Sequence, residues 1–177
     1  MPGATFLRGD RLTLRAVTPN DYAFLHEYGN DPTIREGAPT PTPVSEDDLA
    51  AFVENDERSV QFLPCHDGTP VGFVFLFGIE PCRDHAEIGC WIVPDKQGNG
   101  YATEAAGLCL GHAFEDRGLH KVFAQVFEHN DASMSVLESL GFQREGCLRE
   151  HDYIRGSYRD TCVFGLLADE WSQDRTD

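Results

Sequence analysis

The sequence has little positive charge. Of its 177 residues, 14 are Lys or Arg and 30 are Asp or Glu, which gives a formal net charge of −16. Lysine occurs only at Lys96 and Lys121. A field of this sign repels nucleic-acid phosphates and anionic lipids, so we expect neither a nucleic-acid partner nor a membrane partner. The acid excess and scarce lysine also predict a halophilic protein, kept soluble at salt concentrations that screen its self-repulsion.

Long apolar segments are absent as well. No run approaches the roughly 18 apolar residues that span a bilayer. The N-terminal stretch MPGATFLRGDRLTLR lacks the continuous apolar core of a signal peptide. We therefore expect a cytoplasmic protein.

Paired cysteines of the metal-binding kind are also missing. The sequence has no CxxC pair and no His at zinc-finger spacing. Its six cysteines stand singly, at Cys65, Cys82, Cys90, Cys109, Cys147 and Cys162. We expect reduced, mostly buried thiols and no metal site.

The composition that is present is that of a folded protein. Hydrophobic residues make up 41%, aromatic residues 11% and charged residues 25%, all near ordinary globular values. A chain of 177 residues can bury one core well and is short for two. We expect one domain spanning residues 1–177.

Strand-like and helix-like segments alternate along the chain. The strand-like runs are residues 12–17, 60–66, 70–79, 86–93 and 121–127, with two more around Cys147 and Val163. The helix-like segments follow the capping sites Thr18 and Ser45, reaching about residues 30 and 57, and occupy about 100–116 and 131–140. The Pro-rich stretch 37–45 excludes regular structure. The pattern predicts an α/β (α+β) fold with helices packed on a mixed sheet.

The most informative stretch is WIVPDKQGNGYATEA, residues 91–105, where a strand leads through a glycine-containing turn into a helix. Gly98 and Gly100 tolerate positive φ and carry no side chain. Successive backbone N–H groups can therefore converge on a phosphate at the positive end of the helix dipole. The segment predicts an anion site, with an ordinary strand-to-helix turn as the alternative.

Two familiar phosphate-binding loops do not fit this stretch. A P-loop requires Lys and then Ser or Thr after its last glycine, but Tyr101 and Ala102 follow Gly100. A dinucleotide-binding turn requires a third glycine, where this chain has Thr103, and an acid about 20 residues later, where it has none.

The spacing Gln97-x-x-Gly100-x-Ala102 resembles instead the pyrophosphate loop of the GCN5-related N-acetyltransferases (GNAT). A second block, HNDASMSVLESLGFQREG at residues 129–146, is similar to a segment of the branch that includes the ribosomal-protein N-terminal acetyltransferases. The resemblance extends from about Phe6 to Trp171. It implies a single-domain fold with a central mixed, mostly antiparallel sheet of about seven strands, flanked by about four helices.

The resemblance also implies acetyl-CoA as the cosubstrate and a set of residues that bind it. These are Ile92, Val93, Gln97, Gly98, Asn99, Gly100, Tyr101, Ala102, Asn130 and Ser133. Gln97 is included through the motif alone and is otherwise a solvated loop residue. Asn130 is also a helix N-cap candidate, and the two roles are compatible. Tyr101 has a hydroxyl group, but we expect its ring to pack.

The implied reaction is direct attack of a neutral amine on the thioester, with no covalent enzyme intermediate. Glu87 is the candidate base, since an acid in an apolar strand has a raised pKa; the alternative is an outward-facing residue in a salt bridge. A backbone N–H near Ile92 or Val93 is the candidate oxyanion donor. Many relatives place a tyrosine acid where this chain has Leu137, which leaves Ser133 as proton donor or as a polar first-turn residue.

The sequence thus predicts acetyl transfer to an amine, with a protein N-terminal α-amine as first choice. The alternatives are a small-molecule acetyltransferase acting on a polyamine, aminoglycoside or amino acid, and a non-catalytic acyl-CoA-binding module. The stiff segment 37–45 is the expected wall of the acceptor mouth, and the protein is expected to be a monomer or homodimer.

Overall fold

The computed structural model describes residues 3–38, 42–55, 58–80 and 82–173. Within these residues it contains nine strands: β1 (Thr5–Arg8), β2 (Leu12–Ala16), β3 (Val60–His66), β4 (Thr69–Pro70), β5 (Gly72–Glu80), β6 (His85–Ile92), β7 (Lys121–Phe127), β8 (Gln143–Ile154) and β9 (Ser157–Leu167). The α-helices are α1 (Tyr22–Gly29), α2 (Pro32–Arg35), α3 (Glu46–Asn55), α4 (Tyr101–Gly111), α5 (Asp131–Ser139) and α6 (Ala168–Gln173). A π-helical turn at His112–Asp116 extends α4.

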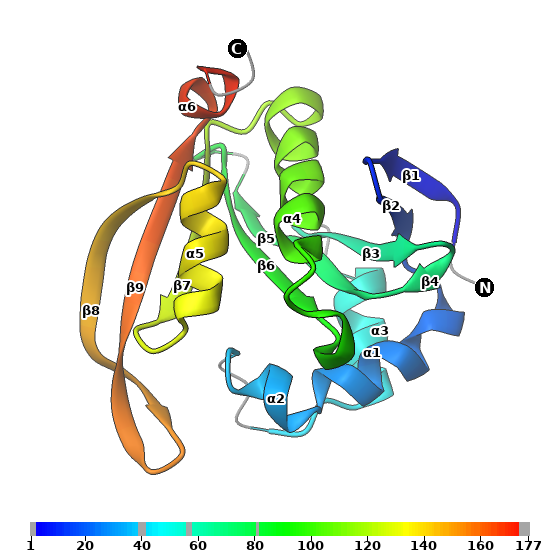
Figure 1. Cartoon of the computed structure of the whole chain (residues 1–177), viewed down its shortest axis with the longest axis horizontal. Coiled ribbons are helices and arrows are strands. Elements are labelled where there is room, and N and C mark those ends of the chain that lie inside the picture. The colour runs from blue at the N-terminus through cyan, green and yellow to red at the C-terminus, as the bar shows by residue number, and fades with distance from the viewer. Residues whose placement is uncertain (1–2, 39–41, 56–57, 81, 174–177) are drawn as a thin grey trace.

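The strands form one sheet in the order β1-β2-β3-β5-β6-β7-β9-β8, with β4 paired to β3 (Figure 1). Every neighbouring pair is antiparallel except β6 and β7, which are parallel. The connection between these two parallel strands contains α4, as a parallel crossover requires. The expected mixed, mostly antiparallel sheet is therefore confirmed.

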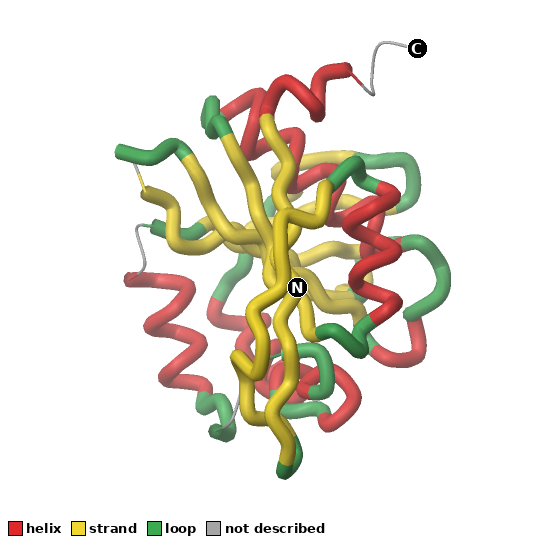
Figure 2. Tube along the Cα trace, turned by 90° about the vertical axis from the view of Figure 1, so that its left-hand side faces the viewer, coloured by secondary structure: helices red, strands yellow, loops and turns green. Residues whose placement is uncertain are grey.

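Helices cover both faces of the sheet (Figures 1 and 2). On one face, α4 packs through its buried residues Ala105, Cys109 and Leu110 into the larger apolar core. On the other face, Leu25 of α1 and the side chains of α3 join a smaller, aromatic-rich core around Phe73. Because successive strand side chains point to opposite faces, β6 contributes to both cores.

Local sequence signals determine where several helices begin. The Asp21 carboxylate accepts hydrogen bonds from the Thr18 N–H at 2.8 Å and from the Thr18 hydroxyl at 2.7 Å, which closes the predicted cap before α1. Ser45 and Asp48 exchange hydrogen bonds in the same way before α3. The Asp67-Gly68 turn has both residues at positive φ, as a tight hairpin turn requires.

The structure has more elements than the seven strands and four helices that we expected. The additional elements are short: β1, α2 and α6 have six residues or fewer, too few for a periodic signal. The run at 70–79 is divided into β4 and β5 at Val71, next to Pro70, which has no N–H to donate. No described helix is long and apolar enough to cross a membrane.

Candidate functional site

The sheet opens in its centre, where β6 and β7 diverge. The two strands pair only at His85↔Lys121, Ala86↔Val122 and Glu87↔Phe123, although β6 continues to Ile92 and β7 to Phe127. Beyond Glu87, β6 remains paired to β5 on its other edge, and β7 remains paired to β9. The result is a V-shaped opening with one free strand edge on each side.

Backbone groups of β6 face this opening. Val93 N–H donates to the Val71 carbonyl at 2.9 Å, so it points toward β5. Because N–H direction alternates along a strand, Ile92 N–H points the opposite way, into the opening. The Ile92 carbonyl accepts from Gln97 Nε2 at 3.0 Å. Of the two expected oxyanion donors, Val93 has its N–H bound to the Val71 carbonyl, so the Ile92 N–H is the candidate that remains accessible.

A glycine-containing loop lies between β6 and α4, as the sequence predicts. Gly98 and Gly100 both adopt positive φ, at 73° and 77°. Asn99 Nδ2 donates to the carbonyls of Lys96 and Gln97, which fixes the loop from within. Residues 97–100 are exposed. The first-turn N–H groups of α4 have no helical partner, so this loop can bind an anion.

A brace that the sequence analysis missed supports this loop. Glu104 on the first turn of α4 accepts from the backbone N–H groups of Arg11 and Leu12 at 2.7 and 2.9 Å and from Arg11 Nε at 2.9 Å. Arg11 Nη1 donates to the Asn99 carbonyl at 2.7 Å, and its guanidinium lies over the Tyr101 ring at 5.1 Å. Arg11 therefore adds a cation beside the loop, and Tyr101 packs as expected.

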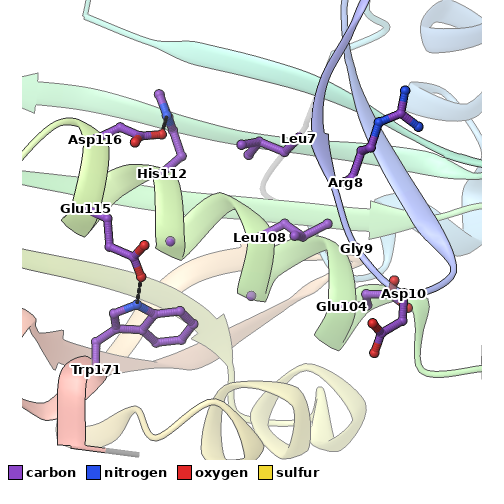
Figure 3. A pocket seen from close by; sticks show the side chains of 12 residues that line it. Leu7, Arg8, Gly9, Asp10, Glu104, Leu108, His112, Glu115, Asp116 and Trp171 are labelled. Atoms are coloured by element: carbon purple, nitrogen blue, oxygen red, sulfur yellow. Dashed lines mark hydrogen bonds and ion pairs between the residues drawn. The ribbon is translucent and has the colours of Figure 1, made fainter. Parts of the chain in front are cut away.

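Figure 3 shows Glu104 at one end of a groove that continues along α4 past Leu108 to Trp171. The groove runs between β1 and α4, and Trp171 Nε1 closes its far end by donating to Glu115 at 3.4 Å. Its lining includes neither Glu87 nor any residue of the loop from Gln97 to Ala102. It is therefore separate from the V-shaped opening.

Glu87 lies where β6 and β7 diverge. It is the last β6 residue paired to β7. Gln125 Nε2 of β7 donates to its carboxylate at 3.4 Å, and no ion pair to Glu87 is found among the described residues. Burial raises the pKa of Glu87, and the Gln125 hydrogen bonds offset only part of that rise. The geometry therefore favours a proton acceptor over the salt-bridge alternative.

The second sequence block forms α5 on the other side of the opening. Asn130 Oδ1 accepts from Ser133 N–H at 3.1 Å, so the predicted N-cap is present. Ser133 lies half-buried in the first turn. Leu137 is buried in the larger core and has no proton to offer. Ser133 therefore offers a hydroxyl group near the N-terminus of α5.

Residues before and within the Pro-rich stretch reach across to α5 and the β8–β9 hairpin. Gly37 lies so close to Asn130 that a Cβ added to it would be 2.9 Å from Asn130 Nδ2. Glu36 pairs with Arg155 at the hairpin tip at 2.6 Å. Residues 39–41 of the predicted wall lie outside the described residues. The described part of this segment, with the hairpin tip, forms one side of the opening.

The hairpin beside this segment carries exposed apolar side chains. Tyr153 is 65% exposed and Tyr158 is 63% exposed, and their rings pack edge to face at 5.1 Å. Leu148 on the same hairpin is 40% exposed. A monomeric surface usually avoids such a grouping unless it has a partner.

Comparison with known proteins places these features in a family. Residues 11–143 match the family described as acetyltransferase (GNAT) domain. The chain is 32% identical over 110 residues to YdaF of Bacillus subtilis, provisionally named a ribosomal N-acetyltransferase, an alignment that spans 62% of this chain and 60% of that relative. It is 29% identical over 157 residues to spermidine N(1)-acetyltransferase of Escherichia coli, spanning 85% and 84%.

Solved structures agree with the sequence matches. Spermidine N-acetyltransferase from Vibrio cholerae in complex with CoA and spermine superposes with a TM-score of 0.87 at 27% identity, covering 93% of this chain and 99% of that one. The ribosomal L7/L12 α-N-protein acetyltransferase RimL has a TM-score of 0.84 at 20% identity, covering 94% and 99%, and shares the fold.

The Glu104 brace gives a pH-dependent prediction. Burial alone would raise the pKa of Glu104, but the N–H groups of Arg11 and Leu12 and the Arg11 guanidinium outweigh it, so the pKa is lowered. A lowered folded-state pKa stabilises the fold above the unfolded pKa of about 4.3, and this stabilisation is lost as pH falls through the folded value.

We therefore expect Glu104→Gln to lower the free energy of unfolding by about 1.5–3 kcal/mol near neutral pH. The difference from the wild type should shrink below about pH 4. Urea titrations across this range measure both quantities. Glu138→Gln, at an exposed position on α5, serves as the control and should show no such pH dependence. If the difference in unfolding free energy between Glu104→Gln and the wild type stayed constant across this pH range, the role of the charge would be contradicted.

Proposed function

The chain belongs to the GNAT family of acetyl-CoA-dependent N-acetyltransferases, and from this premise we propose that it acetylates the N-terminal α-amine of a protein or peptide. The observation that carries the proposal is the V-shaped opening between β6 and β7, which has an unpaired backbone edge, a half-buried carboxylate at its apex and an exposed apolar hairpin at its mouth.

The unpaired edge of β6 suits the pantetheine arm of acetyl-CoA. That arm carries two amides, which can pair with free strand N–H and carbonyl groups as another strand would. The pyrophosphate would bind the N–H groups from Gly98 to Ala102, since the Gln97 N–H already donates to the Pro94 carbonyl, with Arg11 supplying a nearby positive charge. Asn130 would contact the arm through Nδ2, since its Oδ1 serves as the helix cap.

The groups around the opening can serve the three steps of acetyl transfer. Glu87 would take a proton from the ammonium group of the acceptor, either directly or through one water molecule, and so produce the neutral amine that attacks. Ile92 N–H would donate to the oxyanion that forms when the neutral amine attacks the thioester carbonyl. Ser133 would protonate the departing CoA thiolate, which leaves with little help because its pKa resembles that of a free cysteine.

The hairpin beside the mouth favours a polypeptide acceptor. Exposed Leu148, Tyr153 and Tyr158 offer apolar contacts that a peptide chain uses and a small polycation does not. A polyamine is the second candidate, because spermidine acetyltransferases are among the relatives and a net charge of −16 attracts any cation. Both acceptors present a primary amine to the same carboxylate.

Gly100→Val tests the cosubstrate loop. Valine at a φ of 77° would strain the backbone and block the N–H groups, so we expect acetyl-CoA to bind at least about tenfold more weakly, or about 1.4 kcal/mol. Gly118→Val is the matched control, because Gly118 also has positive φ but lies beyond the π-helical turn. Calorimetry and circular dichroism measure affinity and folding; equal affinities for folded Gly100→Val and wild type would refute the loop assignment.

Glu87→Gln tests the base. A base works only when deprotonated, so kcat/KM should rise with pH through the raised pKa of Glu87, and this limb should disappear in the variant. We expect kcat to fall by about 10²–10⁴-fold with acetyl-CoA affinity retained. Glu138→Gln should keep both rate and profile. A retained limb in Glu87→Gln, with a rate near that of the wild type, would assign Glu87 a structural role.

The acceptor is tested by a CoA-thiol release assay with mass spectrometry of the products. Peptides with a free small N-terminal residue should exceed spermidine and aminoglycosides by at least about tenfold in kcat/KM at matched salt, because only a peptide can contact the hairpin. Leu148→Ser should reduce that preference and leave spermidine turnover unchanged. Equal or faster turnover of spermidine by the wild type would establish the polyamine assignment instead.

A further inference from the structure

Two cysteines face each other across the β8–β9 hairpin. Cys147 and Cys162 are direct cross-strand partners, and their sulfur atoms lie 3.5 Å apart as free thiols. Opposed residues in an antiparallel pair have Cα atoms about 4.5–5.5 Å apart, within the range of about 4.4–6.8 Å that a disulfide spans. Rotation of the side chains can therefore close this bond while the strands stay in register.

The two thiols differ in their access to solvent. Cys147 is exposed, whereas Cys162 is only 1% exposed. A reagent from solution can reach the first sulfur, and the second is held directly behind it.

Of the remaining cysteines, burial raises the pKa of Cys65 to about 11 and that of Cys90 to about 12, and Cys109 is fully buried. Cys82 is exposed, and no second sulfur is found beside it among the described residues.

Charged groups flank the pair. Burial raises the pKa of Cys162, and the nearby Arg144 guanidinium offsets only part of that rise. Asp160 Oδ2 lies 4.0 Å from Cys147 Sγ and can accept its proton. The thiolate is the reactive form of cysteine, and the exposed Cys147 is the thiol of the pair that a dissolved reagent reaches first.

We propose that Cys147 and Cys162 form a redox modification site that reacts with low-molecular-weight disulfides. The Cys147 thiolate attacks one sulfur of the disulfide, forms a mixed disulfide and releases one thiolate, which takes up the proton lost by Cys147. Cys162 then loses its proton and its sulfur attacks Cys147 Sγ; the second thiolate leaves and takes up that proton, and a Cys147–Cys162 bond remains. Two protein thiols are oxidised and one disulfide is reduced to two thiols.

The product is a covalent link across the hairpin whose tip pairs with Glu36 through Arg155. It would hold the base of the hairpin closed beside the proposed acceptor mouth. Glutathione disulfide and CoA disulfide share the required chemistry. The test of this site does not depend on the identity of the acetyl acceptor or on the role of Glu87, because it measures protein mass directly.

The test incubates the reduced full chain with glutathione disulfide in one arm and CoA disulfide in the other, followed by intact-mass measurement and peptide mapping. The wild type should lose two hydrogens and yield a Cys147–Cys162 cross-linked peptide, with dithiothreitol reversing the change. Cys162→Ala should retain one thiol adduct on Cys147. Cys147→Ser should form neither product, and Cys82→Ser should still form the Cys147–Cys162 cross-linked peptide, without any adduct at position 82. Reaction in only one arm would identify the source of the disulfide.

Two results would overturn the proposal. One is a wild-type protein that keeps a stable adduct on Cys147 while Cys162 remains free to alkylate. The other is a Cys147 that stays unmodified in both arms under conditions that modify Cys82. If Cys162→Ala fails to fold by circular dichroism, the cross-linked peptide in the wild type decides the question alone.

Discussion

The separation of β6 from β7 beyond Glu87 is the constraint on which the rest of the site depends. A continuous ladder would use every N–H and carbonyl of β6 and leave no edge for a ligand. Because β5 continues to pair with the other edge of β6, the strand remains part of the sheet as far as Ile92. The opening therefore follows from the strand pairing, and its edge, apart from the Ile92 carbonyl that Gln97 binds, can pair with another backbone-like group.

The same separation requires support from both faces of the sheet. On one face, α4 and α5 lie on either side of the gap, and small residues such as Ala105 and Ala106 let α4 approach the strands closely. On the other face, an aromatic group around Phe73 and Trp91 fills the space beneath β5 and β6. A sheet that has lost hydrogen bonds at its centre thus regains cohesion from side-chain packing.

The sequence predicted those parts of the site that depend on neighbouring residues. Positive φ at Gly98 and Gly100, the Asn130 cap and the unusual position of Glu87 in an apolar strand were all visible locally. The Arg11–Glu104 brace was not predicted, because its partners are 93 residues apart and each alone reads as a solvated charge. The hydrogen bond of the Val93 N–H was not predicted either, because hydrogen-bond direction depends on the strand with which a residue pairs. Short elements such as α2 gave no periodic signal, although Glu36, directly after α2, supplies the contact that reaches the hairpin.

The Glu36–Arg155 ion pair joins two elements that are distant in sequence, and its exposure limits how firmly it can hold them. Both side chains are more than half exposed, and such pairs contribute about 0.5 kcal/mol, which corresponds to a closed-to-open ratio of only about two to one. A contact of this strength breaks and reforms far faster than an enzyme turns over. The ion pair therefore favours the hairpin position in which Glu36 and Arg155 are in contact, but it does not fix the hairpin there. Acceptor entry and product release past this contact would then be fast. The chemical step or the release of CoA would limit the turnover rate.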